Sequence, residues 1–306
     1  MWELVVNLLL ASLFFQAQVA APLPTGDNRL PAADNKPLAS VLPQRDFSSQ
    51  SLGVKISARN FVVVEPTTGK ILFESGSQTA RSIASITKLM TALVFLEHNP
   101  GWEKEVTISE TDYRDGGINY FFAGEKIKVK DLFYSTLVAS SNEGALALAR
   151  STGLSAEEFT RAMNLKAKEL KMTEANFTDP SGLDNKNKAS ALDVIKLARA
   201  AFIQPEIKRA TALKEYSFAV GDKGVIRKVQ NTDKILGQDF GLGDGRYKIE
   251  AGKTGYLEQA GYCFVSQVAD ERNRQVLVAV LGSPTITSRF TDTKSLAYWA
   301  FNNYQW

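Results

Sequence analysis

Three short polar motifs stand out in this 306-residue chain because their residue types can do chemistry together. The first, Ser85-Ile86-Thr87-Lys88, places a hydroxyl and an amine three residues apart, so on a helix the two side chains share one face. A neutral lysine amine can take the proton of a serine hydroxyl and so make the oxygen nucleophilic. Burial or a second nearby cation would lower the pKa of Lys88 enough for that role. The motif predicts a serine nucleophile with a lysine base.

The position of this motif at a predicted helix start adds a second chemical property. We expect a helix over residues 85–98, and free backbone N–H groups at a helix start stabilise a developing oxyanion. Alone, however, the motif is equally typical of an ordinary helix start that carries an exposed lysine.

The second motif is Ser140-Ser141-Asn142, which interrupts an apolar helical pattern. Polar groups at such a position lower stability unless they find hydrogen-bond partners. A hydroxyl can relay a proton, and a carboxamide can both donate to and accept from a peptide. The alternative is an ordinary turn between two helices.

The third motif, Lys253-Thr254-Gly255, lies in a predicted strand. Glycine lets a substrate backbone approach closely, lysine adds a cation and threonine adds a hydroxyl donor. Strand alternation would put Thr254 on the opposite face from its two neighbours, so this pattern supports a part for Lys253 but not for Thr254. A phosphate-binding loop is excluded, because Tyr247 stands where that motif requires its first glycine.

The composition excludes several other classes of protein. One cysteine, Cys263, and one histidine, His98, exclude an internal disulfide, zinc-finger sites and multi-histidine metal centres. On a shared helix His98 would lie about 20 Å from Ser85, too far for proton transfer, so we expect it to flank the helix end. A net charge of +3 is too small to predict a nucleic-acid partner.

The first 50 residues read as a leader and a linker. Residues 4–15 are almost wholly apolar but too short to span a membrane, and small residues follow at 19–21. Residues 1–21 are therefore predicted to be a secretory signal peptide or an uncleaved anchor, although the expected basic start is missing. Residues 22–50 hold five of the ten prolines and are predicted to be an extended linker.

Strands and helices are expected in separate parts of the remaining chain. Periodicity predicts strands over 61–65, 70–74, 216–220, 248–256, 260–268 and 275–281, and helices over 85–98, 131–150, 155–171, 189–203 and 291–303. The simplest assembly is an α+β fold with one antiparallel sheet built from both chain ends (51–105 and 206–306), flanked by helices. A mostly helical subdomain, 106–205, is inserted within it. A ligand cleft is expected where the subdomain meets the sheet.

The ordered set S-x-x-K, S-x-N, K-T-G resembles that of penicillin-binding proteins and serine β-lactamases. Residues 81–91, and 252–256 through 260–263, more closely resemble the serine-type D-alanyl-D-alanine carboxypeptidases. The runs 179–183, 190–193 and 231–232 look like that family too, although Asp179 stands where an asparagine is more usual. The likeness extends from about residue 55 to 306.

The resemblance implies a β-lactamase/DD-peptidase-like fold and a role for each motif. Ser85 would attack the carbonyl between the last two D-alanines of a peptidoglycan stem peptide. Lys88 would take its proton, and Ser140 would pass a proton to the leaving amine. Water would then hydrolyse the acyl-enzyme, with no cofactor or metal.

The same resemblance implies the residues that bind the substrate. Asn142 would hold the peptide amide, while Lys253, Thr254 and Gly255 would bind the end that carries the terminal carboxylate. Arg289 matches an arginine that meets this carboxylate in the family, or else it is a surface arginine at a helix start. β-Lactam antibiotics, which mimic the D-Ala-D-Ala end, would acylate the serine.

Three rival functions remain at this stage. A DD-endopeptidase of peptidoglycan cross-links would use the same residues. A serine β-lactamase of class A would use a Glu-x-x-x-Asn loop, and no such pattern lies between the second and third motifs. A non-catalytic penicillin-fold binding protein would not need the complete motif set. In each case we expect action outside the cytoplasm, by a protein either secreted or anchored at its N-terminus, where any membrane contact would occur.

Overall fold

The structure is a computed structural model that describes residues 42–49, 51–114, 116–221, 224–241 and 246–306. The predicted leader and nearly all of the predicted linker lie outside these residues. Among the described helices, none combines the length and the apolar character that crossing a bilayer requires.

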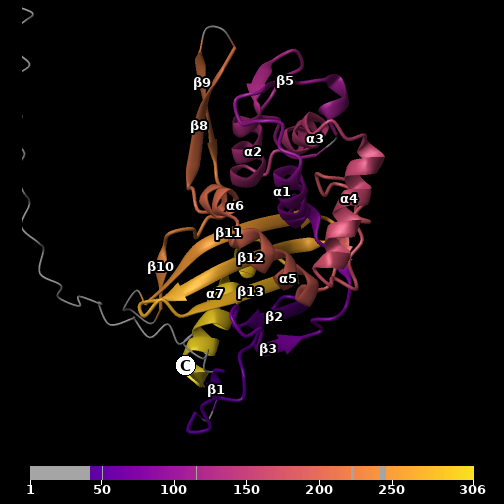
Figure 1. The fold of residues 1–306 in the computed structure, drawn as a ribbon. Helices are drawn as coiled ribbons and strands as arrows, with labels where there is room; N and C mark the ends of the chain where they lie inside the picture. Colours follow the sequence, from indigo (N-terminus) through magenta and orange to yellow (C-terminus); the bar gives the residue numbers. More distant parts are fainter. Residues whose placement is uncertain (1–41, 50, 115, 222–223, 242–245) are drawn as a thin grey trace, which may run out of the picture. The chain divides into compact units, whose positions relative to one another are not determined.

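A six-stranded antiparallel sheet forms the centre of the fold, and its strands come from both ends of the described chain (Figure 1). In spatial order the strands are β10 (Asp239–Phe240), β11 (Tyr247–Leu257), β12 (Gly261–Asp270), β13 (Gln275–Ser283), β2 (Asn60–Val64) and β3 (Ile71–Ser75). The first strand of the chain in this sheet, β2, pairs with β13, the last. Strands from the two ends of the described chain are therefore neighbours in one sheet, and the segments between them form the rest of the fold.

Alternation along the strands separates two hydrophobic cores. Val62 and Val64 of β2 face one core, while Phe61 and Val63 face the other. Helix α7 (Ile286–Asn303) covers the second core by packing on β12 and β13. Helix α5 (Ala191–Phe202) covers the first. Both faces of the central strands are thus buried, which explains why β13 reads as a continuous apolar run.

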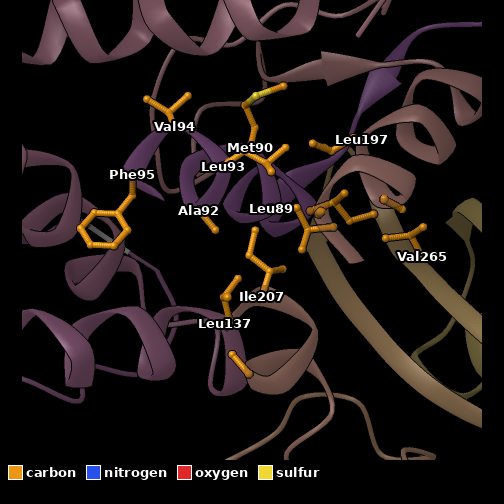
Figure 2. Close-up of a cluster of buried hydrophobic side chains, with 14 of the residues drawn as sticks. Leu89, Met90, Ala92, Leu93, Val94, Phe95, Leu137, Leu197, Ile207 and Val265 are labelled. Atoms are coloured by element: carbon orange, nitrogen blue, oxygen red, sulfur yellow. The ribbon is translucent and has the colours of Figure 1, made fainter. Parts of the chain in front are cut away.

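Helix α1 (Thr87–Glu97) is buried over its whole length up to Phe95. Leu137 of α2, Leu197 of α5 and Val265 of β12 lie around it (Figure 2). A helix that is buried on all sides is held by the core around it. Its side chains are therefore held at fixed positions, and Lys88 lies in its first turn.

The other helices group to one side of the sheet (Figure 1). They are α2 (Val129–Val138), α3 (Asn142–Ser151), α4 (Ala156–Glu169) and α6 (Pro205–Thr211), with the short 3₁₀ turns η1 (Ala84–Ile86) and η2 (Glu110–Asp112). Four two-stranded pairs complete the described chain: β1 (Gln44–Arg45) with β14 (Tyr304–Gln305), β4 (Arg81–Ser82) with β7 (Lys188–Ala189), β5 (Glu105–Thr107) with β6 (Lys126–Lys128), and β8 (Glu215–Val220) with β9 (Val225–Gln230).

The predicted α+β class, with a sheet from both chain ends and helices inserted between them, is confirmed. The single helix expected over 131–150 is wrong: Ser140 adopts φ 62°, which no helix continues through, and the pattern divides into α2 and α3. Helix α6 is not among the predicted helices; it begins at Pro205, and proline is well suited to a first helical position. His98 is the C-cap of α1, as predicted.

The buried carboxylate of Asp292 ties the N-terminal entry of the sheet to α7. It accepts hydrogen bonds from the Ser57 and Ala58 backbone N–H groups and from the Ser57 and Ser283 hydroxyls, at 2.8–3.0 Å. These donors lie before β2 and at the end of β13, and Asp292 itself belongs to α7, so one side chain joins three parts of the fold.

We predict that Asp292→Ala lowers the free energy of unfolding by about 3 kcal/mol, because it leaves two buried donors, the Ala58 N–H and the Ser283 hydroxyl, without an acceptor. Urea denaturation followed by circular dichroism measures this change. The exposed Glu271→Ala serves as control and should stay within about 0.5 kcal/mol of the parent chain. An Asp292→Ala protein as stable as the parent would contradict this assignment.

Candidate active site

The first motif lies where η1 passes into α1. Ala84 adopts φ 47° immediately before Ser85, which turns the serine out of the preceding strand and leaves it partly exposed. Lys88 is fully buried, and its Nζ lies 2.9 Å from Ser85 Oγ. The predicted hydroxyl–amine pair is therefore formed at hydrogen-bond distance.

The hydrogen bonds of Lys88 fix the direction of its lone pair. Its Nζ lies 2.7 Å from Asn142 Oδ1 and 2.6 Å from the Ser181 carbonyl oxygen. The Asn142 amide is oriented with its oxygen toward Lys88, because its nitrogen donates to the Gly116 carbonyl at 2.9 Å. A neutral amine has two N–H donors, and these two acceptors use both of them. The remaining lone pair is directed at the Ser85 hydroxyl.

Burial also favours the neutral form of the Lys88 amine. It is the largest influence on Lys88 and lowers its pKa to about 7, although the charges of Asp179 and Glu143 oppose the shift. A substantial fraction of Lys88 is therefore unprotonated at neutral pH, which is the state a general base requires.

The second motif forms the turn between α2 and α3, so it is both a turn and part of the site. Ser141 is the N-cap of α3 and accepts from the Gly144 backbone N–H. Capping Ser141 and the positive φ of Ser140 place Ser140 and Asn142 on either side of the cap. Ser140 Oγ accepts a hydrogen bond from Lys253 Nζ at 2.9 Å.

The third motif lies on the free edge of the sheet. Strand β10 pairs with β11 only at Tyr247 and Lys248, so beyond these residues no described strand covers the outer edge of β11. Lys253 reaches Ser140 from this edge, while Thr254 shares a 2.6 Å hydrogen bond with the Thr232 hydroxyl. Both neighbours thus contact the site, which strand alternation alone did not predict for Thr254.

Gly255 lets β11 approach the turn that carries the serine. A Cβ at this position would lie 2.5 Å from the Ile83 carbonyl oxygen and 3.3 Å from the Ile86 nitrogen. Only glycine allows this contact, which aligns the edge strand with the N–H groups around Ser85.

Two more cations lie close to the site and carry no salt bridge with a described acid. Burial, followed by the charges of Lys88 and Arg289, holds the pKa of Lys253 well below its ordinary value. Burial also lowers the pKa of Arg289 to about 10, so its guanidinium stays charged at neutral pH. Arg289 is only 5% exposed, lies over the Tyr262 ring and donates to the Gly255 carbonyl at 3.3 Å, so the surface alternative for it is wrong.

A cavity of about 420 Å³ opens above these groups. Its lining includes Ser85, Ser140, Asn142, Thr254, Gly255 and Arg289, while the two lysines lie beneath its surface. A larger cavity of about 620 Å³ lies between α7 and residues 51–54, but it holds none of the motif residues and one charged side chain, Lys294. The smaller cavity therefore carries the chemistry. Among the described residues, no cluster of three or more His, Cys, Asp or Glu side chains could hold a metal ion.

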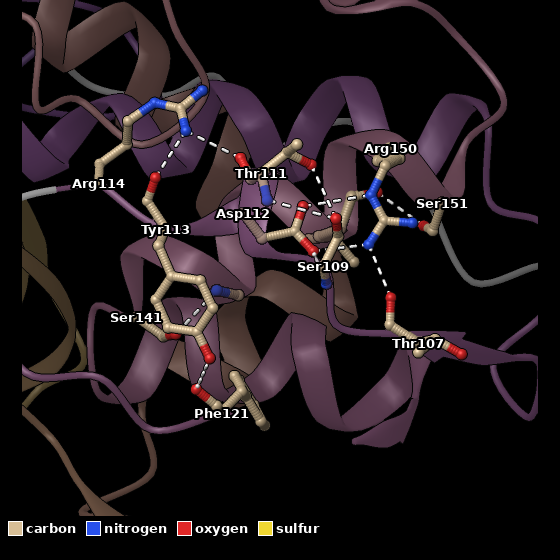
Figure 3. A network of polar contacts seen from close by, with 12 residues as sticks. Thr107, Ser109, Thr111, Asp112, Tyr113, Arg114, Phe121, Ser141, Arg150 and Ser151 are labelled. Carbon is tan, nitrogen blue, oxygen red and sulfur yellow. Dashed lines mark hydrogen bonds and ion pairs between the residues drawn. The ribbon is translucent and has the colours of Figure 1, made fainter. Parts of the chain in front are cut away.

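A polar network fastens residues 107–121 to α3. Arg150 of α3 binds Asp112 and donates to the Thr107 carbonyl, and the Tyr113 hydroxyl donates to the Phe121 carbonyl (Figure 3). Buried Glu143 accepts from the backbone N–H of Phe121 and of its predecessor. The two hydrogen bonds to Glu143 fasten Tyr120, which lines the cavity, and Phe121 onto the start of α3.

Sequence reasoning missed four residues of this site: Ser181 and Glu143 beside Lys88, Thr232 beside Thr254, and Asp233 beneath β11. Burial raises the pKa of Asp233 to about 6, while the charges of Arg289 and Lys253 oppose the shift. The runs that contain Ser181 and Thr232 were noted for their family likeness, and that likeness was the available signal. The contribution of Ser181 is a backbone carbonyl, which residue type does not reveal.

Comparisons with known proteins agree with this geometry. Residues 45–285 match the family Peptidase_S11, D-alanyl-D-alanine carboxypeptidase. A D-alanyl-D-alanine endopeptidase of Haemophilus influenzae is 32% identical over 243 residues, covering 78% of this chain and 80% of the relative. The D-alanyl-D-alanine carboxypeptidase DacF of Bacillus subtilis is 31% identical, covering 81% of this chain and 63% of the relative.

A solved structure is similar as well. Penicillin-binding protein D2 of Listeria monocytogenes, in its cefotaxime-bound form, has a TM-score of 0.69 and 27% identity, covering 82% of this chain and all of that one. Because the family matches most of the length of this chain, the chain belongs to peptidase family S11, the D-alanyl-D-alanine carboxypeptidases.

Proposed function

We propose that this serine peptidase cleaves the bond after a D-alanine through an acyl-enzyme, with Ser85 as nucleophile and Lys88 as general base. The observation that carries the proposal is the 2.9 Å separation of Lys88 Nζ and Ser85 Oγ, with the amine buried and its two N–H groups held by other acceptors. As Oγ bonds to the carbonyl carbon, its proton passes to Lys88. The carbonyl oxygen becomes an oxyanion, which the Ser85 backbone N–H and the adjacent edge of β11 stabilise.

The leaving amine needs a proton, and Ser140 is placed to deliver it. Its hydroxyl receives a hydrogen bond from Lys253, so it can give up its own proton and be reprotonated from the lysine side. The C–N bond then breaks, and the D-amino acid leaves with a neutral amine. In the second half of the reaction water attacks the acyl carbon and gives its proton through Ser140 to Lys253. Ser85 Oγ leaves and takes back the proton held by Lys88, so the shortened peptide is released with a new carboxyl group and the site is restored.

Charge supports binding of the carboxylate end of the peptide. Arg289 is a buried cation that lines the cavity and Thr254 adds a hydroxyl, while the buried amine of Lys253 beneath the surface gains a proton when a carboxylate binds beside it. Asn142 uses its amide N–H toward Gly116, yet its oxygen keeps a second lone pair that can accept from a peptide N–H. Gly255 leaves the edge of β11 open to an extended peptide.

The preferred substrate in this proposal is the stem pentapeptide of peptidoglycan, from which the terminal D-alanine is removed. A second candidate is the cross-link between two stem peptides, because the relative from Haemophilus influenzae is an endopeptidase. Both substrates present a carbonyl of D-alanine to the same serine. They differ in the size of the leaving group that the open end of the cavity must admit.

β-Lactams are expected to acylate Ser85. The similar Listeria monocytogenes protein was solved with cefotaxime bound, and here Ser85, Ser140 and Thr254, one from each motif, line the cavity. The β-lactam carboxylate would meet Lys253 and Arg289, and its strained amide would take the place of the peptide bond.

We further place residues 51–306 as the catalytic domain, with 51–105 and 206–306 as its sheet part and 106–205 as its helical insert. Since peptidoglycan lies outside the cytoplasm, the protein acts there. The N-terminal segment would export the domain, as a cleaved signal peptide or as an anchor that makes the only membrane contact.

We predict that purified protein releases D-alanine from a pentapeptide ending in D-Ala-D-Ala and binds a fluorescent penicillin covalently. Mass spectrometry should locate the label on Ser85, and Ser85→Ala should abolish both signals. Lys88→Met removes the base and should slow acylation at least ~10³-fold. A cross-linked muropeptide tested in parallel decides between the two substrates.

Lys248→Met is the matched control, since it removes an exposed lysine of β11 that lies away from the cavity. It should leave both rates unchanged. Rapid turnover of the penicillin would identify a β-lactamase instead. Absence of both product and label in the parent protein would indicate a non-catalytic binding protein.

We predict that export removes the leader close to residue 21. Intact-mass measurement of the protein recovered from outside the cytoplasmic membrane checks this directly. A mass that still includes residues 1–21, measured in a membrane-bound fraction, would contradict cleavage and indicate an uncleaved anchor.

A further inference from the structure

The loop 179–184 carries the carbonyl that holds Lys88, and one side chain organises this loop. Asp179 Oδ1 accepts from the Ser181 backbone N–H at 2.6 Å, from the Ser181 hydroxyl and from the Gly182 N–H at 2.8 Å. Asp179 Oδ2 accepts from the Asp184 N–H at 3.0 Å and from the Asn187 amide at 2.5 Å. The Ser181 carbonyl that results from this turn lies 2.6 Å from Lys88 Nζ.

In all of these hydrogen bonds both carboxylate oxygens of Asp179 act as acceptors. An ionised carboxylate is acceptor-only and satisfies them all, whereas an asparagine would direct its own N–H₂ at two of them. Burial favours the neutral acid, yet the hydrogen bonds from Ser181, Asp184 and Gly182 outweigh it, so the pKa of Asp179 is lowered. The geometry thus demands a negative charge at this position.

The negative charge of Asp179 lies near Lys88, the amine that must be neutral to act as a base. The charged groups that influence Lys88 or are influenced by it are Asp179 on the loop, Glu143 on α3 and Lys253 on β11. Asp179 is the larger of the two opposing influences that keep the pKa of Lys88 from falling further under burial. A neutral residue there would leave the amine unprotonated at lower pH.

We propose that Asp179 is a positioning residue that holds the Ser181 carbonyl on Lys88 and whose charge sets the lower pH limit of the reaction. This inference rests on the proposed function, in which neutral Lys88 is the base. It assigns to the residue before Pro180, where the sequence departs from the usual asparagine, an electrostatic part in catalysis. The protein would therefore work in a higher pH range than the same fold with an uncharged residue at 179.

The test is the pH dependence of acylation by a fluorescent penicillin, measured as a second-order rate constant between pH 5 and 9. In the parent protein the rate should rise through about pH 7 as Lys88 loses its proton. Asp179→Asn removes the charge, so the rise should move to lower pH by about 0.5 to 1 unit. The plateau should also fall, because the asparagine cannot accept every hydrogen bond.

Three further variants separate charge from structure. Asp179→Glu keeps the charge and disturbs the turn, so it should lower the plateau without moving the rise. Asp184→Asn removes a charge from the same loop that does not act on Lys88, and should leave the rise in place. Asp179→Ser replaces Asp179→Asn if the latter fails to fold, since it also removes the charge but offers a hydroxyl oxygen to the turn.

A rise at the parental pH in the folded charge-removing variant overturns the inference and leaves the proposed function intact. An equal displacement in Asp184→Asn also overturns it, because the effect would then belong to the loop as a whole. Failure of the parent protein to acylate at any pH overturns the proposed function itself.

Discussion

The site depends on one buried amine whose surroundings leave it a single free direction. Lys88 has no exposed surface, and two acceptors that cannot donate, Asn142 Oδ1 and the Ser181 carbonyl, use both N–H groups of its neutral form. Its lone pair is then directed at the Ser85 hydroxyl. Burial lowers the pKa of the amine to about 7, so a substantial fraction of it is neutral at that pH. The hydrogen bonds orient it, so its protonation state and its direction both follow from the way the fold encloses it.

The rest of the fold can be understood as the means of burying that amine without closing the site. Helix α1 is buried on every side by other helices and by the sheet, which holds Lys88 in place. The α2–α3 turn and the 179–184 loop bring polar partners to it from the helical side. The free edge of β11 brings Lys253 from the sheet side, and the cavity between them stays open to a peptide.

Sequence patterns predicted the parts of this arrangement that depend on side-chain type and short-range spacing. The three-residue step from Ser85 to Lys88 and the apolar periodicity of the strands were sufficient for a helix-borne pair and for the α+β class. The division of 131–150 into two helices depends on the positive φ of Ser140, which residue type does not favour. The Ser181 carbonyl could not be predicted either, because every residue has one and only the folded loop decides where it points.

The central claim is that Lys88 is a neutral amine at working pH, and nuclear magnetic resonance can measure this directly. In protein labelled with ¹³Cε,¹⁵Nζ-lysine, loss of the signal in Lys88→Met identifies the resonance, and its shift is followed from pH 5 to 11. We expect a titration midpoint near pH 7. A midpoint close to that of an exposed lysine, at about pH 10.4, would contradict the account, because the amine would then be protonated whenever the reaction takes place.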